Sequence, residues 1–119
     1  MTAPQRHPFL DDLAEDVVLH SSILPAPVSG RAEVLRVVKA GGSLYRRQIP
    51  TFLGNIDGRG IFEYDVELTD GSTARGLVSM VRNGTGEVTH LHITFSPLGA
   101  VMAMAQALAT PSPAPSFLS

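Results

Sequence analysis

Histidine, tyrosine and aspartate side chains are the groups in this sequence that could carry out chemistry. His20 stands beside Ser21 in an apolar, β-branched stretch. An imidazole titrates near neutral pH, so inside a cavity it could take a proton from a carbon acid or activate a water molecule. Strict alternation along a strand points Leu19 and Ser21 inward and His20 outward, whereas a one-residue bulge would reverse this order. His20 is therefore a candidate catalytic base if such a bulge turns it inward.

Tyr64 and Asp65 are neighbours on a second apparent strand, so their side chains must point to opposite faces. Tyr64 belongs to an apolar row, and its hydroxyl could donate a hydrogen bond to a ligand carbonyl. The alternative is a core tyrosine whose hydroxyl reaches water or the backbone. Asp65 belongs to an acidic stripe with Glu63 and Glu67. Asp65 becomes a candidate base only if the acidic residues of this strand, and not the apolar ones, point into the cavity. Otherwise the acidic stripe is a solvated or partner-facing surface.

His90 and His92 have a spacing that places both imidazoles on one face of a strand. Such a pair could hold a metal ion, but no acidic residue or cysteine with suitable ligand spacing accompanies it. The apolar residues Leu91 and Ile93 alternate with the histidines and should point to the inner face of the sheet. The two histidines should therefore point to its outer, convex face. We therefore predict no metal site, and we expect the histidines at an interface or in solvent.

Composition limits the kind of protein. The 119 residues suffice for one domain with one core. A net charge of −2 without a basic cluster argues against a nucleic-acid partner. The absence of cysteine excludes disulfides, a thiolate nucleophile and a cysteine-bound zinc. No apolar run could span a bilayer, and the first residues lack the apolar stretch of a secretion signal. These features predict a cytoplasmic location and no membrane partner.

The elements that must position the candidate groups begin with a helix, a strand and a second helix. The periodicity predicts a short amphipathic helix over residues 9–16 and a buried strand over residues 17–22. After a proline-rich loop, a capped helix should run from Ser29-Gly30 to Gly41-Gly42, with Glu33 reaching back to the cap. Leu44 and Tyr45 could add one more turn to it.

A period of two follows and predicts an antiparallel meander with strands over residues 49–53, 60–69, 74–82 and 87–95. Asp70-Gly71 is a strong hairpin signal. A last, largely apolar helix should begin at Pro97. The expected fold class is α+β, a curved antiparallel sheet with helices packed on its concave face, in one domain over residues 1–109. The proline- and serine-rich tail, residues 110–119, is expected to be disordered.

Two segments resemble the nuclear transport factor 2-like superfamily, whose cone-shaped, cystatin-like fold occurs in SnoaL-like polyketide cyclases, ketosteroid isomerases and limonene-epoxide hydrolases. They are LAEDVVLHSSILPAPVSGRAEV and NGTGEVTHLHITFSP, and the local likeness is greatest to the epoxide hydrolases. The resemblance implies a pocket for a small apolar molecule that is terpenoid, steroid or polyketide-like. It also implies isomerase, cyclase or epoxide-hydrolase chemistry without a cofactor, and a homodimer.

The residues that carry these reactions in the resembling families are not kept here. The family positions for acids, bases and water-holding groups fall on Leu19, Ser21, Tyr64, Val66, Val78 and Ser96. A resemblance of fold without the site residues does not transfer the reaction.

Two functions therefore remain open from the sequence. In the first, His20 or Asp65 is the base and Tyr64 the hydrogen-bond donor of a cofactor-free enzyme. In the second, the chain is a non-catalytic ligand-binding or dimerisation module. Both use an apolar pocket, for which we predict the lining residues Leu19, Ser21, Leu35, Phe62, Val66, Val78, Met80, Leu91, Ile93 and Phe95.

Overall fold

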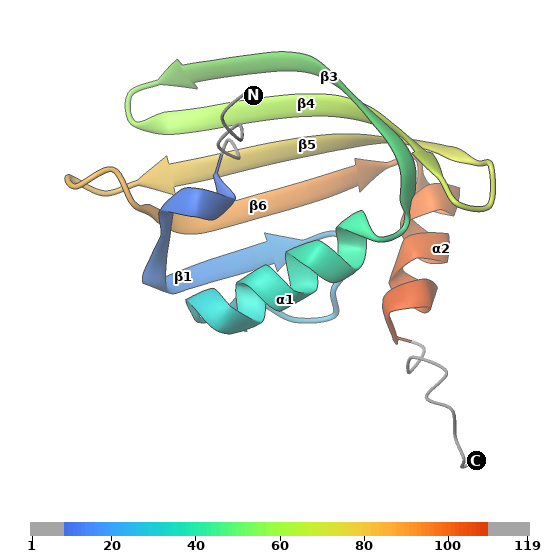
Figure 1. Cartoon of the computed structure of the whole chain (residues 1–119), viewed down its shortest axis with the longest axis horizontal. Coiled ribbons are helices and arrows are strands. Elements are labelled where there is room, and N and C mark those ends of the chain that lie inside the picture. Colours follow the sequence, from blue (N-terminus) through green and yellow to red (C-terminus); the bar gives the residue numbers. More distant parts are fainter. Residues whose placement is uncertain (1–8, 110–119) are drawn as a thin grey trace, which may run out of the picture.

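The computed structural model describes residues 9–109, so the predicted disordered tail lies outside the described residues. Along the chain, a single turn of 3-10 helix is followed by six strands and two α-helices (Figure 1). The elements are η1 (Leu10–Asp12), β1 (Leu13–Ser21), β2 (Val28–Ser29), α1 (Arg31–Gly42), β3 (Tyr45–Ile56), β4 (Arg59–Leu68), β5 (Thr73–Arg82), β6 (Val88–Ser96) and α2 (Leu98–Ala109).

The strands form one curved sheet in the order β2-β1-β6-β5-β4-β3. Strands β3 to β6 are the predicted antiparallel meander. The sheet as a whole is mixed, because β1 pairs with β6 in the parallel sense, from Val18 opposite His90 to Ser21 opposite Ile93. The expectation of an entirely antiparallel sheet is thus corrected. The α+β class and the curved sheet are confirmed.

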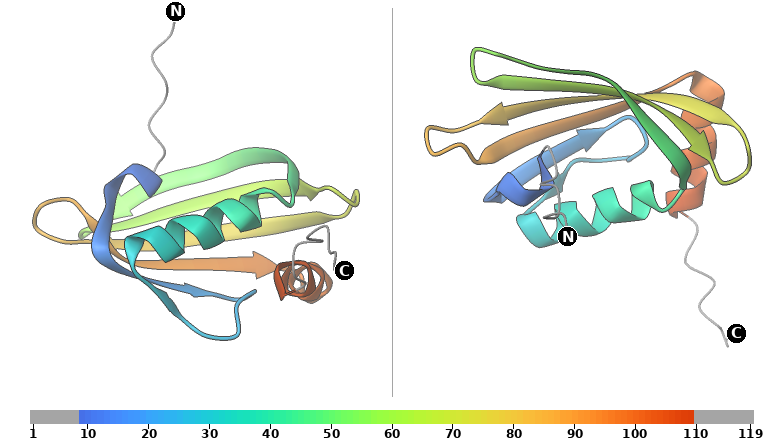
Figure 2. Two further views of the ribbon diagram at one scale, coloured as in Figure 1. Left: turned by 60° about the horizontal axis from the view of Figure 1, so that its bottom comes forward. Right: turned by 45° about the horizontal axis from the view of Figure 1, so that its top comes forward.

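The two helices have different places on the sheet (Figures 1 and 2). Helix α1 lies across the concave face, with Val34 fully buried. Its start is tied to β1, because Arg31 Nε donates a hydrogen bond to the carbonyl oxygen of Leu13 at 3.1 Å. Glu33 does not cap the helix but forms an ion pair with Arg36 at 2.8 Å. Helix α2 lies where β6 ends and contacts both β6 and α1.

The predicted helix over residues 9–16 is wrong beyond its first turn. Only Leu10–Asp12 is helical, and β1 already begins at Leu13, which pairs with Val88 of β6. The apolar residues Phe9 and Leu13 are buried all the same. Sheet pairing and burial of this segment therefore outweigh its helix-like periodicity.

Strand β3 is much longer than the predicted strand over residues 49–53. It pairs with β4 from Tyr45 opposite Leu68 to Ile56 opposite Arg59. Tyr45 therefore opens a strand and does not extend α1. The hairpin between β3 and β4 turns at Asp57 and Gly58, with φ of 52° and 75°. Two successive positive φ values suit a tight hairpin turn, where glycine carries no steric penalty.

Candidate ligand-binding site

A cavity of about 220 Å³ lies between α1 and the concave face of the sheet. Its walls come from the first described residues, β1 and the loop that follows it, α1, and strands β3, β4 and β6. The lining residues are Phe9, Leu10, Leu19, Ser21, Ile23, Leu24, Val37, Val38, Lys39, Gly42, Tyr45, Gln48, Phe62, Tyr64, Ile93 and Phe95.

The exposed lining residues define the mouth of this cavity. Lys39, Gly42 and Gln48 are exposed, whereas the lining residues of β1, β4 and β6 are buried or half-buried and Tyr45 of β3 is half-buried. These three residues flank the junction where α1 ends and β3 begins. The cavity therefore has an apolar floor on the sheet and a polar rim at this junction.

Two tyrosine hydroxyls form the central polar feature of the wall. The hydroxyl oxygens of Tyr45 and Tyr64 lie 3.0 Å apart, and either can be the donor. Burial raises the pKa of both hydroxyls, and the Tyr64 hydroxyl beside it raises that of Tyr45 further. Both groups are therefore protonated at neutral pH. Because one O–H is used between them, the pair has one O–H to offer a ligand.

Aromatic contacts hold Tyr64 in place. Its ring stacks on Phe62 with 5.1 Å between the ring centroids, and meets the edge of Phe95 at 6.4 Å. On β5, Gly76 lies directly opposite Tyr64. A Cβ atom added at Gly76 would come within 2.4 Å of Tyr64 Cζ. The ring can lie flat on the sheet only because residue 76 has no side chain.

The predicted lining residues divide into two groups. Six sequence-predicted site residues line the cavity, namely Leu19, Ser21, Phe62, Tyr64, Ile93 and Phe95. Val78, Met80 and Leu91 are packed in the core and do not reach the cavity. Leu35 is half-buried against this core, and Val66 lines a separate depression near the end of β6. The cavity is thus smaller than the concave face, because side chains fill the rest.

His20 does not enter the cavity. Beyond Val18 the register of β1 with β6 is regular, and the irregularity in this pairing lies before Val18. The alternation therefore keeps Leu19 inside and His20 outside. His20 stacks on His92 on the outer face, with ring centroids 4.8 Å apart and an angle of 11° between the planes. The bulge that would have made His20 a pocket base is absent at this position.

Asp65 also lies on the outer face. Its side chain is 48% exposed and forms an ion pair with Arg75 at 3.2 Å. Tyr64, its neighbour, is buried, so β4 points Tyr64 inward and Asp65 outward, as the alternation in the sequence indicated. Neither candidate base is therefore within reach of the cavity. His92 belongs to the same outer face, where partial burial, His20, His90 and Arg59 lower its pKa.

Several lining residues were missed from the sequence. Phe9 and Leu10 were assigned to a helix, whereas they belong to the segment that closes one side of the cavity. Tyr45 and Gln48 were missed because the start of β3 was not recognised. The register of β3 shifts between Tyr45 and Arg47, so no simple alternation marks its inward residues.

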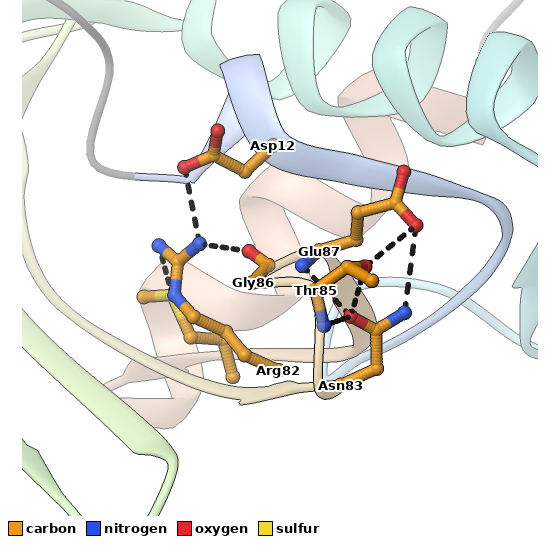
Figure 3. Close-up of polar contacts among 7 residues, drawn as sticks. Asp12, Arg82, Asn83, Thr85, Gly86 and Glu87 are labelled. Atoms are coloured by element: carbon orange, nitrogen blue, oxygen red, sulfur yellow. Dashed lines mark hydrogen bonds and ion pairs between the residues drawn. The ribbon is translucent and has the colours of Figure 1, made fainter.

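A polar network fixes the segment that carries Phe9 and Leu10 (Figure 3). Arg82 Nη1 donates to Asp12 Oδ2 at 3.0 Å and to the Gly86 carbonyl oxygen at 2.8 Å. Asn83 organises the same hairpin, since its Oδ1 accepts a hydrogen bond from the Thr85 hydroxyl at 2.8 Å. The start of the described chain is thus attached to the hairpin between β5 and β6, at the opposite end of β5 from the start of β3.

Within residues 9–109, the structure contains no group of three or more histidine or acidic side chains that could bind a metal ion. No helix in this part of the chain is long and apolar enough to cross a membrane.

Comparison with known proteins supports the fold and not a particular activity. No family model and no curated protein matches the sequence. Among solved structures, a cystatin-like protein from Silicibacter pomeroyi aligns with a TM-score of 0.77 at 19% identity, covering 83% of this chain and 70% of that one. A steroid delta-isomerase from Pseudomonas aeruginosa aligns with a TM-score of 0.76 at 12% identity, covering 83% and 73%.

A third structure carries the family name that the sequence suggested. It is an NTF-2 like protein of unknown function from Burkholderia xenovorans, with a TM-score of 0.64 at 17% identity over 73% of this chain and 66% of that one. Identities this low establish architecture alone. The chain therefore has the cystatin-like, NTF2-like fold that these solved structures share.

Proposed function

We propose that this chain is a non-catalytic binding protein for a small apolar molecule, held in the cavity with an oxygen atom at the Tyr45–Tyr64 pair. The observation that carries the proposal is the character of the cavity wall. It is aliphatic and aromatic, and away from the exposed mouth its polar groups are two hydrogen-bonded phenols and the Ser21 hydroxyl. Pockets of this kind use a few placed polar groups to orient an otherwise apolar ligand.

The residues that line the cavity give less support to the alternative function, an enzyme that uses a general base. A base must come within hydrogen-bond reach of the proton that it removes. Among the described residues, no histidine, aspartate or glutamate lines the cavity. His20 and Asp65 are on the other side of the sheet. An isomerase, cyclase or epoxide-hydrolase mechanism that uses either of them would require the strand to flip.

The size of the cavity favours a small ligand. Pockets for drug-sized molecules occupy roughly 300–1,000 Å³, and this one measures about 220 Å³. Of the terpenoid, steroid and polyketide-like molecules that the family resemblance implies, a molecule of one ring fits this volume better than a fused polycycle. We therefore propose a monoterpenoid-sized ligand.

Tyrosine fluorescence offers a direct test, because the chain has two tyrosines and no tryptophan, and both tyrosines line the cavity. Titration with carvone, a monocyclic terpene ketone, should change the emission of the wild-type protein in a saturable way. A Tyr64→Phe variant should bind carvone several-fold more weakly, since a hydrogen bond contributes about 1 kcal/mol.

The control is His20→Ala, which removes an outer-face side chain and should leave carvone binding unchanged. If carvone and related monocyclic ketones leave the emission unaltered at millimolar concentration, the binding proposal is wrong. Turnover of such a ketone that disappears in His20→Ala or Asp65→Ala would restore the enzyme hypothesis.

We also propose a homodimer formed through the outer face of the sheet. Ile49, Phe52 and Ile56 of β3 are 46%, 52% and 69% exposed, and they pair with outward-facing residues of β4. The same face carries both Asp65 and Arg75, so in a twofold-related copy the Asp65 of one subunit could face the Arg75 of the other.

Light scattering should give twice the chain mass, and the Phe52→Glu variant should have the mass of a monomer. A monomeric wild-type protein at micromolar concentration would contradict this assembly.

A further inference from the structure

The polar lining groups of the cavity are mainly hydrogen-bond donors. Lys39 offers only N–H groups, and the tyrosine pair offers one remaining O–H. Gln48 adds an amide with two N–H groups and one acceptor oxygen. Ser21 adds a hydroxyl whose oxygen accepts a hydrogen bond from Ile23 N at 3.4 Å, which leaves its O–H as a further donor. No carboxylate or imidazole stands among the lining residues within the described chain to act as a strong acceptor. The ligand that complements this wall therefore brings an acceptor group.

Lys39 gives the mouth a positive charge. It is the one charged residue among the described residues that line the cavity. Within residues 9–109, no ion pair or hydrogen bond engages its ammonium group. The other cation of this helix, Arg36, is instead neutralised by Glu33 at 2.8 Å and does not line the cavity.

Lys39 is not needed to satisfy the carbonyl groups at the C-terminal end of α1. Cations are favoured at helix C-termini, where the last carbonyl groups lack partners. Here the carbonyl oxygens of Lys39, Ala40 and Gly41 already accept bonds, from Ser43 N at 3.0 Å, Ser43 Oγ at 2.6 Å and Leu44 N at 3.1 Å. The ammonium group of Lys39 is thus free to meet a charge at the mouth.

We propose that the natural ligand is a small hydrophobic carboxylic acid, with its apolar body on the aromatic floor and its carboxylate at the mouth beside Lys39 and Gln48. This inference rests on the binding function proposed above, adds the chemical class of the ligand and places its oxygen atoms at the mouth instead of at the tyrosine pair. One cation balances one negative charge, which suits a carboxylate. A phosphate monoester carries more charge and is commonly bound by arginine. No arginine stands among the described residues that line this cavity.

Calorimetric titration with octanoate and octanamide tests this inference, because the two probes share a chain and differ in the charge of the head group. At neutral pH and low salt, we expect the wild-type protein to bind octanoate about fivefold more tightly than octanamide. Lys39→Gln should abolish this preference, and Lys39→Arg should retain it. Added salt should reduce it, since the mouth is exposed.

Arg36→Gln is the matched control, because it removes a positive charge from the same helix outside the cavity. It should keep the fivefold preference. Equal binding of both probes by the wild-type protein, or a preference that survives Lys39→Gln, overturns the carboxylate assignment. If carvone still binds in that case, only the ligand class is wrong. If carvone also fails to bind in that case, the proposed function is wrong as well.

Discussion

The two faces of the central strands differ in chemistry although the same four hairpin-connected segments build both. The concave face presents Phe62, Tyr64 and Phe95, and among the described strand residues that line the cavity the tyrosines are the ionisable ones. The outer face presents Asp65 with Arg75, and His20 stacked on His92. In the described chain, the groups best suited to acid–base chemistry are thus separated from the cavity by the thickness of the sheet.

The difference teaches that strand parity, and not the presence of reactive residues, decides what this cavity can do. Side chains of neighbouring strand residues point to opposite faces. Tyr64 and Asp65 are adjacent in sequence, yet one shares a hydrogen bond in the cavity wall and the other pairs with a surface arginine. The comparison predicts that equal substitutions on the two faces have unequal effects.

The largest effect should come from a leucine in the core. Leu91 is fully buried on the concave side, whereas Leu77 on the neighbouring strand is 40% exposed on the outer side. Leu91→Ala should lower the free energy of unfolding by about 2–5 kcal/mol, the usual cost of a core cavity. Leu77→Ala should cost about 0.5 kcal/mol. Urea denaturation measures the free energy of unfolding of both variants. Similar losses for Leu91→Ala and Leu77→Ala would contradict the difference between the two faces of the sheet.

A methyl group at residue 76 should have the next largest effect. Gly76→Ala places a Cβ atom against the ring of Tyr64 and should destabilise the protein by about 1–3 kcal/mol through overpacking. It should also weaken carvone binding, because the Tyr64 hydroxyl must move. Gly84→Ala is the control, since a Cβ atom there meets nothing within 4 Å. A stable Gly76→Ala protein with unchanged carvone binding would show that the position of the Tyr64 ring does not depend on the missing side chain at residue 76.

The tyrosine pair predicts a loss of stability in alkali. Burial raises the pKa of both hydroxyls above the ordinary value of 10.0. The folded state therefore retains protons that the unfolded chain releases, so the free energy of unfolding should fall as pH rises above about 10. Phenolate absorbance should appear together with unfolding. Tyr45→Phe should cost about 1 kcal/mol at neutral pH and flatten this dependence. Tyrosines that ionise near pH 10 in the folded protein would contradict a buried pair.

The smallest effect belongs to the outer face. The pKa of His92 is lowered from 6.5 by partial burial and by its histidine neighbours and Arg59. The unfolded chain therefore binds a proton more readily than the folded protein, and stability should decline slightly as pH falls through 6.5. Because this face is exposed, we expect less than about 0.5 kcal/mol. His20→Asn should reduce the decline, and an equal decline in this variant would argue against coupling between the two rings.

Much of the fold could be predicted because period-two alternation is strong in β4, β5 and β6. The buried row from Phe62 to Leu68 and the hairpin at Asp70-Gly71 are observed where the pattern placed them. The start of the chain and β3 could not be predicted in the same way. Residues 9–16 have helix-like spacing but pair as a strand from Leu13. Strand β3 is an edge strand whose register shifts twice, so its inward residues follow no single alternation.

The sequence by itself determined which residues share a face of the meander, because alternation is a local property of the backbone. It thereby placed Tyr64 inward and Asp65 outward, as the structure confirms. Tertiary structure alone decided that β1 lies parallel to β6, which sets His20 on His92. It also decided that Tyr45 meets Tyr64 and that Lys39 stands at the mouth. These contacts join residues far apart along the chain, and no local pattern encodes the pairing that brings them together.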